Sequence, residues 1–160
     1  MKKYFLLFSL LIIGVSSCKK ASTNNAAAVT AAQQAATDDA LIKAYISANN
    51  ITAIKDPSGL YYQVLIAGTG AYPTANSNVS LNYTGKLLDG SVFAYTSHIT
   101  SSPLKGFITG WQIGVPYINT GGRILLIIPS ALGYGTSSPG PGIPANSVLV
   151  FTIDLTGFTN

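Results

Sequence analysis

From residue 60 onward the chain is a succession of short β-forming runs, and this succession constrains the fold more than any other feature. Turn-forming residues separate the runs, which cover residues 60–66, 79–90, 91–97, 123–129 and 147–155. The Asp-Gly pair at 89–90 predicts a hairpin between two of them. A helix capped by Thr109 must be short, because Pro116 would break it. The pattern therefore predicts an α+β fold, in which one short helix crosses a single antiparallel sheet.

A second helix is predicted upstream of the sheet, at residues 37–51. Thr37 can cap its first turn, where Asp38 and Asp39 suit the positive end of the helix dipole. An apolar stripe at helical spacing should pack on the domain, and it consists of Leu41, Ile42, Tyr45 and Ile46. The preceding residues, 18–36, are low in complexity and rich in alanine, which predicts a tether that is helical in part.

The first 17 residues are typical of a secretory signal. Two lysines precede an apolar stretch at 4–15, which is shorter than the roughly 20 residues that span a bilayer, and small residues lead up to Cys18. This order resembles a bacterial lipobox, in which the cysteine becomes the lipidated first residue of the mature chain. The alternative is an ordinary signal peptide with a cysteine present by chance. Lipidation of Cys18 would anchor the domain in the cell envelope, at the outer membrane facing the periplasm.

These signals divide the chain into four parts: a signal peptide at 1–17, a tether at 18–36, a helix and turn at 37–58 and one domain at 59–160. Nine basic and five acidic residues are spread along the chain without clustering, which argues against a nucleic-acid partner. With one histidine and one cysteine, the chain lacks the parts of a metal site or a nucleophilic triad, and we expect neither metal nor cofactor. Any activity must therefore work without a nucleophile or an acid–base pair.

The loop at 132–146, "LGYGTSSPGPGIPAN", is longer than a plain connection between two strands. It is either a slack linker or one wall of a site. Five aromatic residues recur around it in the β-forming part of the chain: Tyr83, Phe93, Trp111, Tyr134 and Phe151. Taken singly, each can be explained as part of the core of a small sheet.

The residues that flank these aromatics carry more information. In order, "VSLNYTGKLLDGSVF", "GFITGWQIGV", "GGRILLIIPSALGYG" and "GIPANSVLVFTIDL" resemble the FKBP family of peptidyl-prolyl cis–trans isomerases over about residues 60–158. The upstream helix and "SGLYYQV" are similar to the region before this domain in bacterial lipoprotein members. The resemblance implies a bent antiparallel sheet that wraps a short helix, with a shallow apolar cleft between them.

The resemblance also implies roles for single residues. Trp111 would form the floor of the cleft, beneath the proline ring of a substrate. The backbone N–H of Ile108 would hold a substrate carbonyl, and the Tyr134 hydroxyl would donate to the carbonyl of the bond that twists. The sides and the rim would be lined by Tyr83, Phe93, Phe107, Ile143 and Phe151.

Two departures from the family pattern affect the expected activity. Ala94 stands where the family has a cleft aspartate, which leaves Tyr83 without its usual partner. The segment before "GFITGW" is shorter than usual and lacks its aromatic wall, which Leu104 would replace in part. The implied function is a prolyl isomerase that assists the folding of exported proteins, with proline-containing segments as partners and a reduced rate. The alternatives are a proline-binding or chaperone-like module with little turnover and a structural lipoprotein whose aromatics are all core.

Overall fold

The computed structural model describes residues 23–160, and side chains from residue 30 onward. The predicted signal peptide and Cys18 lie outside the described residues. The described residues contain two α-helices, α1 (Thr23–Ala48) and α2 (Thr109–Gly114). The six strands are β1 (Ile54–Lys55), β2 (Tyr61–Ile66), β3 (Asn78–Lys86), β4 (Val92–Pro103), β5 (Arg123–Ile128) and β6 (Leu149–Thr159). Short 3₁₀ turns occur at η1 (Leu104–Gly106), η2 (Val115–Tyr117) and η3 (Ser130–Leu132).

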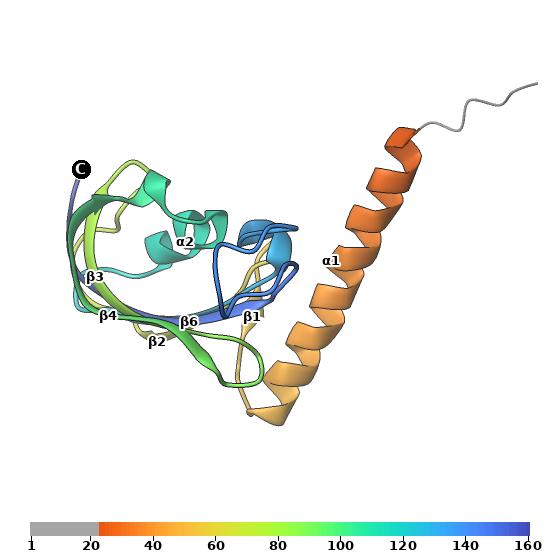
Figure 1. The fold of residues 1–160 in the computed structure, drawn as a ribbon. Coiled ribbons are helices and arrows are strands. Elements are labelled where there is room, and N and C mark those ends of the chain that lie inside the picture. Colours follow the sequence, from red (N-terminus) through yellow and green to blue (C-terminus); the bar gives the residue numbers. More distant parts are fainter. Residues whose placement is uncertain (1–22) are drawn as a thin grey trace, which may run out of the picture.

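The six strands form one antiparallel sheet in the order β1-β2-β5-β6-β3-β4. Figure 1 shows this sheet curving around α2, while α1 stands at one end beside the loop between β5 and β6. The predicted hairpin is confirmed: β3 pairs with β4, and Asp89 and Gly90 lie in the turn, where Gly90 has a φ of 87°. The α+β prediction, with a bent sheet around a short helix and an N-terminal helix before it, is therefore confirmed.

The main core lies between the concave face of the sheet and α2. Alternate residues of the two central strands point into it, so Leu126 of β5 and Ile153 of β6 are fully buried. The outward residues Ile127 and Val150 are also buried, because they belong to a second apolar cluster with Ile42 of α1. Both faces of β5 are thus covered at this end of the sheet, which explains why its sequence is apolar without alternation.

The short helix α2 ends as the sequence predicts, but it begins differently. Its last residue is Gly114, and Pro116 lies in the following 3₁₀ turn. The N-cap position is held by Ile108 rather than Thr109, and no side chain caps the helix. Thr109 is the first helical residue, so its predicted capping role is wrong.

The N-terminal helix is longer than predicted. It begins at Thr23, and the Thr37 hydroxyl lies inside it and donates to the Gln33 carbonyl at 3.0 Å, so Thr37 is not an N-cap. The alanines before Thr37 favour helix, and nothing in that stretch stops one, so the predicted tether is helical from residue 23. Of the predicted stripe, Leu41 is exposed while Ile42 is buried.

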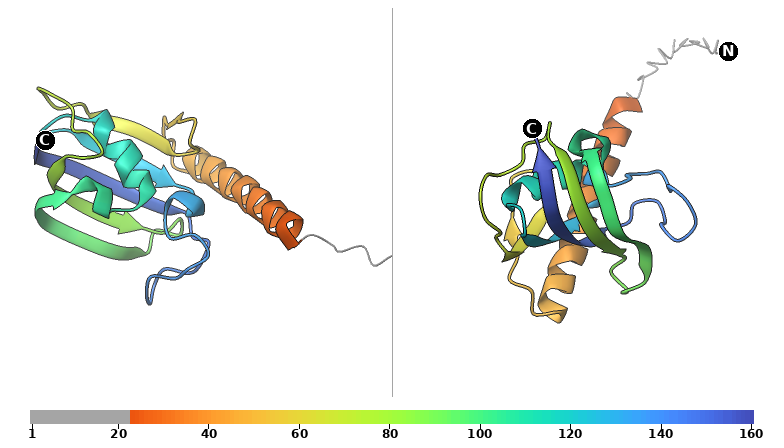
Figure 2. Two further views of the ribbon diagram at one scale, coloured as in Figure 1. Left: turned by 90° about the horizontal axis from the view of Figure 1, so that it is seen from above. Right: turned by 90° about the vertical axis from the view of Figure 1, so that its left-hand side faces the viewer.

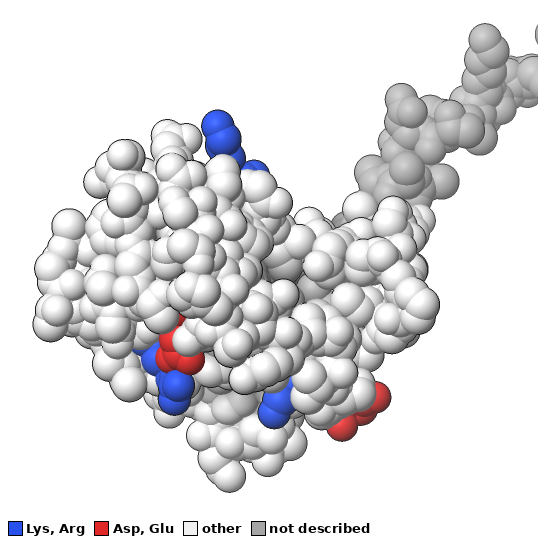
Figure 3. Space-filling view, turned by 60° about the vertical axis from the view of Figure 1, so that its left-hand side comes forward, with Lys and Arg blue, Asp and Glu red and all other residues white. Residues whose placement is uncertain are grey.

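The two views of Figure 2 show α1 extending away from the sheet toward the N-terminus. No helix within residues 23–160 combines the length and the apolar character needed to cross a membrane. The face drawn in Figure 3 carries few charged side chains, and these are scattered rather than gathered in one patch.

Candidate active site

A cleft of about 260 Å³ opens between α2, the strands around β3 and the loop between β5 and β6. We call residues 133–148 of that loop the flap. All eight residues predicted to form the cleft line it together: Tyr83, Phe93, Phe107, Ile108, Trp111, Tyr134, Ile143 and Phe151. Ala94 and Gly106 complete the lining, which contains no charged side chain. Residues far apart in the sequence are thus brought to one site, although their roles stay predictions.

Trp111, the predicted floor residue, lines the cleft and is 3% exposed. It can lie close to the sheet because α2 approaches β5 through glycines: a Cβ on Gly110 would meet Ile128 Cγ2 at 2.6 Å. Its Nε1–H is buried and finds no hydrogen-bond acceptor among the described residues. The indole nevertheless borders the open cleft, which is much larger than the 10–15 Å³ or so that one water needs.

The side walls are aromatic rings that pack edge to face. The Tyr83 and Phe151 rings meet the indole of Trp111 at centroid distances of 4.9 and 5.1 Å, with interplanar angles of 79° and 90°. Phe93 packs edge-on against Phe151 at 5.5 Å. A Cβ on Gly85 would lie 2.7 Å from both phenylalanine rings, so glycine is needed there for the two rings to meet. Such contacts hold the walls rigid.

Phe107 adds a further aromatic ring to the lining of the cleft. Its ring stacks on Trp111 with a centroid distance of 4.9 Å and an interplanar angle of 22°. The predicted substitute, Leu104, is fully buried in the core and does not line the cleft, so that prediction is wrong. Sequence reasoning placed Phe107 in the cleft but missed the stack. The four-residue spacing between Phe107 and Trp111 was the one available signal.

Two hydrogen-bond donors stand at the edge of this apolar cleft. Within residues 23–160 the backbone N–H of Ile108 has no acceptor, although the Ile108 carbonyl accepts from the first turn of α2. The Tyr134 side chain is 37% exposed, and its hydroxyl makes no hydrogen bond to the described residues. Burial and then the nearby Tyr83 hydroxyl raise the pKa of Tyr134, so Tyr134 keeps its proton beyond the pH at which a free tyrosine loses it. Both donors are therefore available to a ligand.

Tyr83 has an unpaired hydroxyl for a different reason. Ala94 lines the cleft on β4, next to the part of β3 that carries Tyr83, and its methyl group offers no acceptor. No described residue accepts a hydrogen bond from Tyr83, which contacts Trp111 and Phe151 through its ring. The cleft consequently lacks a fixed negative charge.

The flap has internal order of its own. Gly140 bridges to Ile143, and the Ser138 hydroxyl lies 2.7 Å from the Ile143 carbonyl. Gly135 and Gly142 adopt φ values of 60° and 92°, which favour glycine. These features hold the flap in shape, so the loop forms a wall of the cleft rather than a slack linker.

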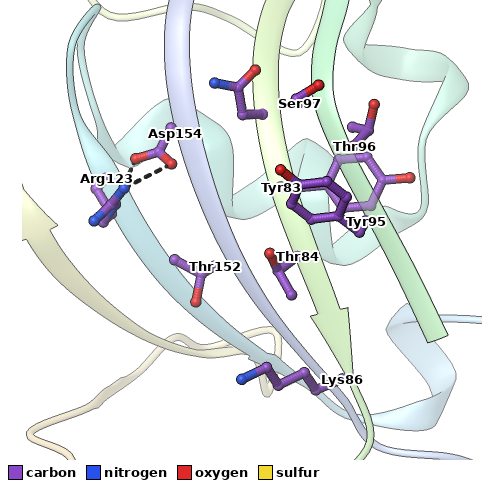
Figure 4. Close-up of a pocket in the computed structure, with 10 residues that line it drawn as sticks. Tyr83, Thr84, Lys86, Tyr95, Thr96, Ser97, Arg123, Thr152 and Asp154 are labelled. Carbon is purple, nitrogen blue, oxygen red and sulfur yellow. Dashed lines mark hydrogen bonds and ion pairs between the residues drawn. The ribbon is translucent and has the colours of Figure 1, made fainter. Parts of the chain in front are cut away.

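A second hollow, of about 410 Å³, lies on the outer face of the sheet (Figure 4). Its lining is mostly polar, and Arg123 and Asp154 form a two-pronged ion pair there, at 2.6 and 3.0 Å. Such polar walls are hydrated and cannot shelter an apolar group, so the smaller cleft is the better candidate for a site that binds one. Within the described residues no group of His, Cys, Asp or Glu could hold a metal ion, and His98 is exposed on β4.

Comparisons with known proteins point to one family. A family model described as FKBP-type peptidyl-prolyl cis-trans isomerase matches residues 70–156. The FKBP-type peptidyl-prolyl cis-trans isomerase FkpA of Escherichia coli K12 is 46% identical over 101 residues, which cover 61% of this chain and 37% of that relative. FK506-binding protein 4 of Dictyostelium discoideum is 38% identical over 102 residues, or 62% of this chain and 28% of that one.

Solved structures agree with this result. The crystal structure of FkpA from Escherichia coli gives a TM-score of 0.68 at 34% identity and covers 85% of this chain and 66% of that one. A peptidyl-prolyl cis-trans isomerase from Pseudomonas syringae pv. tomato gives a TM-score of 0.70 at 26% identity, with 80% and 95% coverage. The matched part spans well under half the length of the curated relatives named above.

Proposed function

We propose, on the premise that this chain belongs to the FKBP-type peptidyl-prolyl cis-trans isomerase family, that it catalyses rotation about X–Pro peptide bonds. The observation that carries the proposal is an aromatic, uncharged cleft with two unpaired donors at its edge, Ile108 N–H and the Tyr134 hydroxyl. Rotation of an amide breaks no bond and moves no proton, so a site without nucleophile or acid–base pair is sufficient.

The cleft can lower the barrier in two ways. The planar amide resists rotation by about 18–20 kcal/mol, because the nitrogen lone pair is delocalised into the carbonyl. Apolar surroundings such as the rings around Trp111 disfavour this more polar planar form. Donors that are already in place favour the twisted form without having to reorganise. Ile108 N–H would hold a neighbouring carbonyl of the substrate, and Tyr134 would donate to the carbonyl that twists.

A proline-containing segment of an unfolded or extended polypeptide is the substrate class that fits. The open cleft accepts a ring from outside and leaves the chain on both sides in solvent. We further propose that the protein is a lipoprotein member of the family, anchored through Cys18 in the cell envelope and facing the periplasm, where it would assist the folding of exported proteins. The support for this part is the signal-like segment ending at Cys18.

The test is a proline-limited refolding assay with the purified chain. Saturable acceleration that is lost in both Trp111→Leu and Tyr134→Phe would support the enzyme. Tyr134→Phe should lower kcat/KM by about tenfold, which corresponds to one lost hydrogen bond. It should leave stability unchanged, because the hydroxyl has no partner in the described residues. If a saturating concentration of this chain leaves the refolding rate of the test protein at its uncatalysed value, the proposal is refuted.

A second candidate function is a binding module with little turnover. The absence of a carboxylate beside Tyr83 favours it, because Ala94 lines the cleft at that point. In that case proline peptides would change the fluorescence of Trp111 on binding, while the isomerisation rate stayed at its uncatalysed value. Unchanged fluorescence on titration with proline peptides would refute both functions and leave the aromatics as core.

A further inference from the structure

Helix α1 contacts the base of the flap through a buried carboxylate. Asp38 is 1% exposed, and its Oδ2 accepts hydrogen bonds from the backbone N–H of Ser130 at 2.8 Å and from the Ser130 hydroxyl at 2.6 Å. Gln34 donates to the other carboxylate oxygen at 2.8 Å. Burial of a carboxylate is costly unless it is well hydrogen-bonded. Three donors meet that need here, so the contact is specific.

Ser130 is also the point from which the flap starts. Its carbonyl accepts from the backbone N–H of Gly133 at 3.0 Å and of Gly135 at 2.8 Å. The Gly135 carbonyl in turn accepts from Asn146 N–H at 2.7 Å, which closes the far end of the loop onto the near end. We call Ser130, Gly133, Gly135 and Asn146 the flap neck. Tyr134 lies between the two glycines of this neck, so whatever holds Ser130 also holds the segment that carries Tyr134.

Besides this carboxylate, α1 meets the flap at its far end, where Ile42 of α1 and Val148 of the flap belong to the same buried apolar cluster. A hollow of about 390 Å³ separates the two, with Ala31 and Ala35 of α1 on one wall and Gly135 and Asn146 on the other. The Asp38 contact lies at the floor of this hollow. Figure 1 shows the flap standing between α2 and α1, without a strand on its outer side. Asp38 therefore joins α1 to the flap neck by direct hydrogen bonds, at the opposite end of the flap from the apolar contact of Ile42.

We propose that Asp38 is a positioning residue for Tyr134, and that α1 is part of the catalytic unit because it fixes the flap neck. Asp38 does not line the cleft and acts through Ser130. This inference rests on the proposed function, since Tyr134 is the group whose position matters there.

The first test does not depend on activity. Amide hydrogen exchange is measured in the full chain and in two neighbouring variants, Asp38→Ala and Asp39→Ala. Asp39 is the matched control, because it also docks α1 but contacts Lys43, Lys55 and Tyr61 rather than the flap. Exchange of Gly135 N–H should become about tenfold faster in Asp38→Ala and stay unchanged in Asp39→Ala. Equal exchange of Gly135 in both variants, whether slow or fast, would overturn the proposal.

The second test asks whether the effect passes through Tyr134. Asp38→Ala should lower kcat/KM by about tenfold, mainly through kcat, while in a Tyr134→Phe background it should add no further loss. If the double variant instead loses kcat/KM by the product of the two single losses, Asp38 acts elsewhere than through Tyr134, which would contradict the proposal. Asp38→Asn should restore most of the rate, because its amide oxygen can still accept from Ser130 and Gln34 can turn its own amide.

If Asp38→Ala does not fold, Ser130→Ala takes its place, since it removes one of the two hydrogen bonds and keeps the backbone donor. Faster exchange at Gly135 in that variant supports the proposal, and unchanged exchange counts against it. A chain without any isomerase activity would refute the proposed function, while exchange at Gly135 would still decide whether Asp38 fixes the neck.

Discussion

Ala94 is the residue that most limits the chemistry of the cleft. Strand β4 places it opposite Gly85 of β3, in the same wall as the Tyr83 ring, but its methyl group cannot accept a hydrogen bond. The Tyr83 hydroxyl is therefore free to rotate. A donor that is not held in place contributes less to a transition state than one that is oriented in advance.

We predict that Ala94→Asp raises kcat/KM by up to about tenfold, since a hydrogen bond to a carboxylate contributes about 1.5–3 kcal/mol and part of this is lost to desolvation. The free energy of unfolding should fall slightly, because position 94 is half-buried. Peptide isomerisation kinetics and urea unfolding measure the two effects. Ala94→Asn is the control, because asparagine has the shape of aspartate without its charge. If kcat/KM of Ala94→Asp is no higher than that of Ala94→Asn, the missing carboxylate does not limit the rate.

The cleft residues could be predicted from sequence because each belongs to a short local motif, such as Tyr83 in "YTG" or Tyr134 in "GYG". The partner of each ring could not be predicted in the same way. Phe107 stacks on Trp111 and Leu104 is buried in the core, and the path of the chain from η1 into α2 decides which of the two reaches the cleft. Local patterns indicate which residues meet a ligand, whereas tertiary packing decides what they meet on the other side.

The contact of α2 with the sheet depends on glycine. We predict that Gly110→Ala destabilises the chain, because its Cβ would lie 2.6 Å from Ile128 Cγ2, and a buried β-branched side chain cannot move away. Overpacking of this kind costs about 1–3 kcal/mol, against about 1 kcal/mol gained in helix propensity. The fluorescence of the adjacent Trp111 should change as well. Gly157→Ala is the control, because nothing lies within 4 Å of its added Cβ; equal stability of the two variants would contradict the prediction.

Helix α1 docks through two neighbouring carboxylates that sequence reasoning assigned to a helix start. Acidic residues after a threonine are typical of a first turn, and that local pattern is real. Asp38 and Asp39 instead sit well inside the helix and make contacts with η3 and with β1 and β2. Partners so distant in sequence leave no local signal, so neither the start of α1 nor its docking could be read from the sequence.

Asp39 makes the docking of α1 sensitive to acid. Hydrogen bonds from Lys43, Lys55 and Tyr61 lower the pKa of Asp39 below its usual value of 3.8. A lowered pKa in the folded state means that the ionised carboxylate stabilises the fold above about pH 4, and that this contribution is lost as the pH falls further. We predict that Asp39→Asn costs about 1 kcal/mol near pH 7 and progressively less below pH 4. Urea unfolding at several pH values measures the free energy of unfolding of the parent chain and of Asp39→Asn. A difference between the two that stays constant down to pH 2 would contradict the prediction.

Taken over the full chain, charge plays a small part in this protein. Charged residues make up 9% of the sequence, and the flap, α2 and the strands bring none of them into the cleft lining. The ion pairs of the described residues lie elsewhere: one within α1, one between α1 and β1, and one on the outer face of the sheet. Substrate should therefore be captured by apolar contact and by the two donors rather than by electrostatic steering.

We predict that kcat/KM for a proline peptide changes by less than about twofold between 0.05 and 0.5 M salt, because no cleft charge is present to be screened. A peptide with an apolar residue before proline should react faster than one with glutamate there, since the walls offer no partner for a charge.

The matched variant is Ala94→Asp, which introduces a carboxylate into the same wall. With a peptide that carries lysine before proline, the rate of this variant should fall as salt is added, whereas that of the parent chain should not. A parent chain whose rate drops tenfold with salt would show that charges outside the cleft guide the substrate, and an apolar hollow alone would then not explain its recognition.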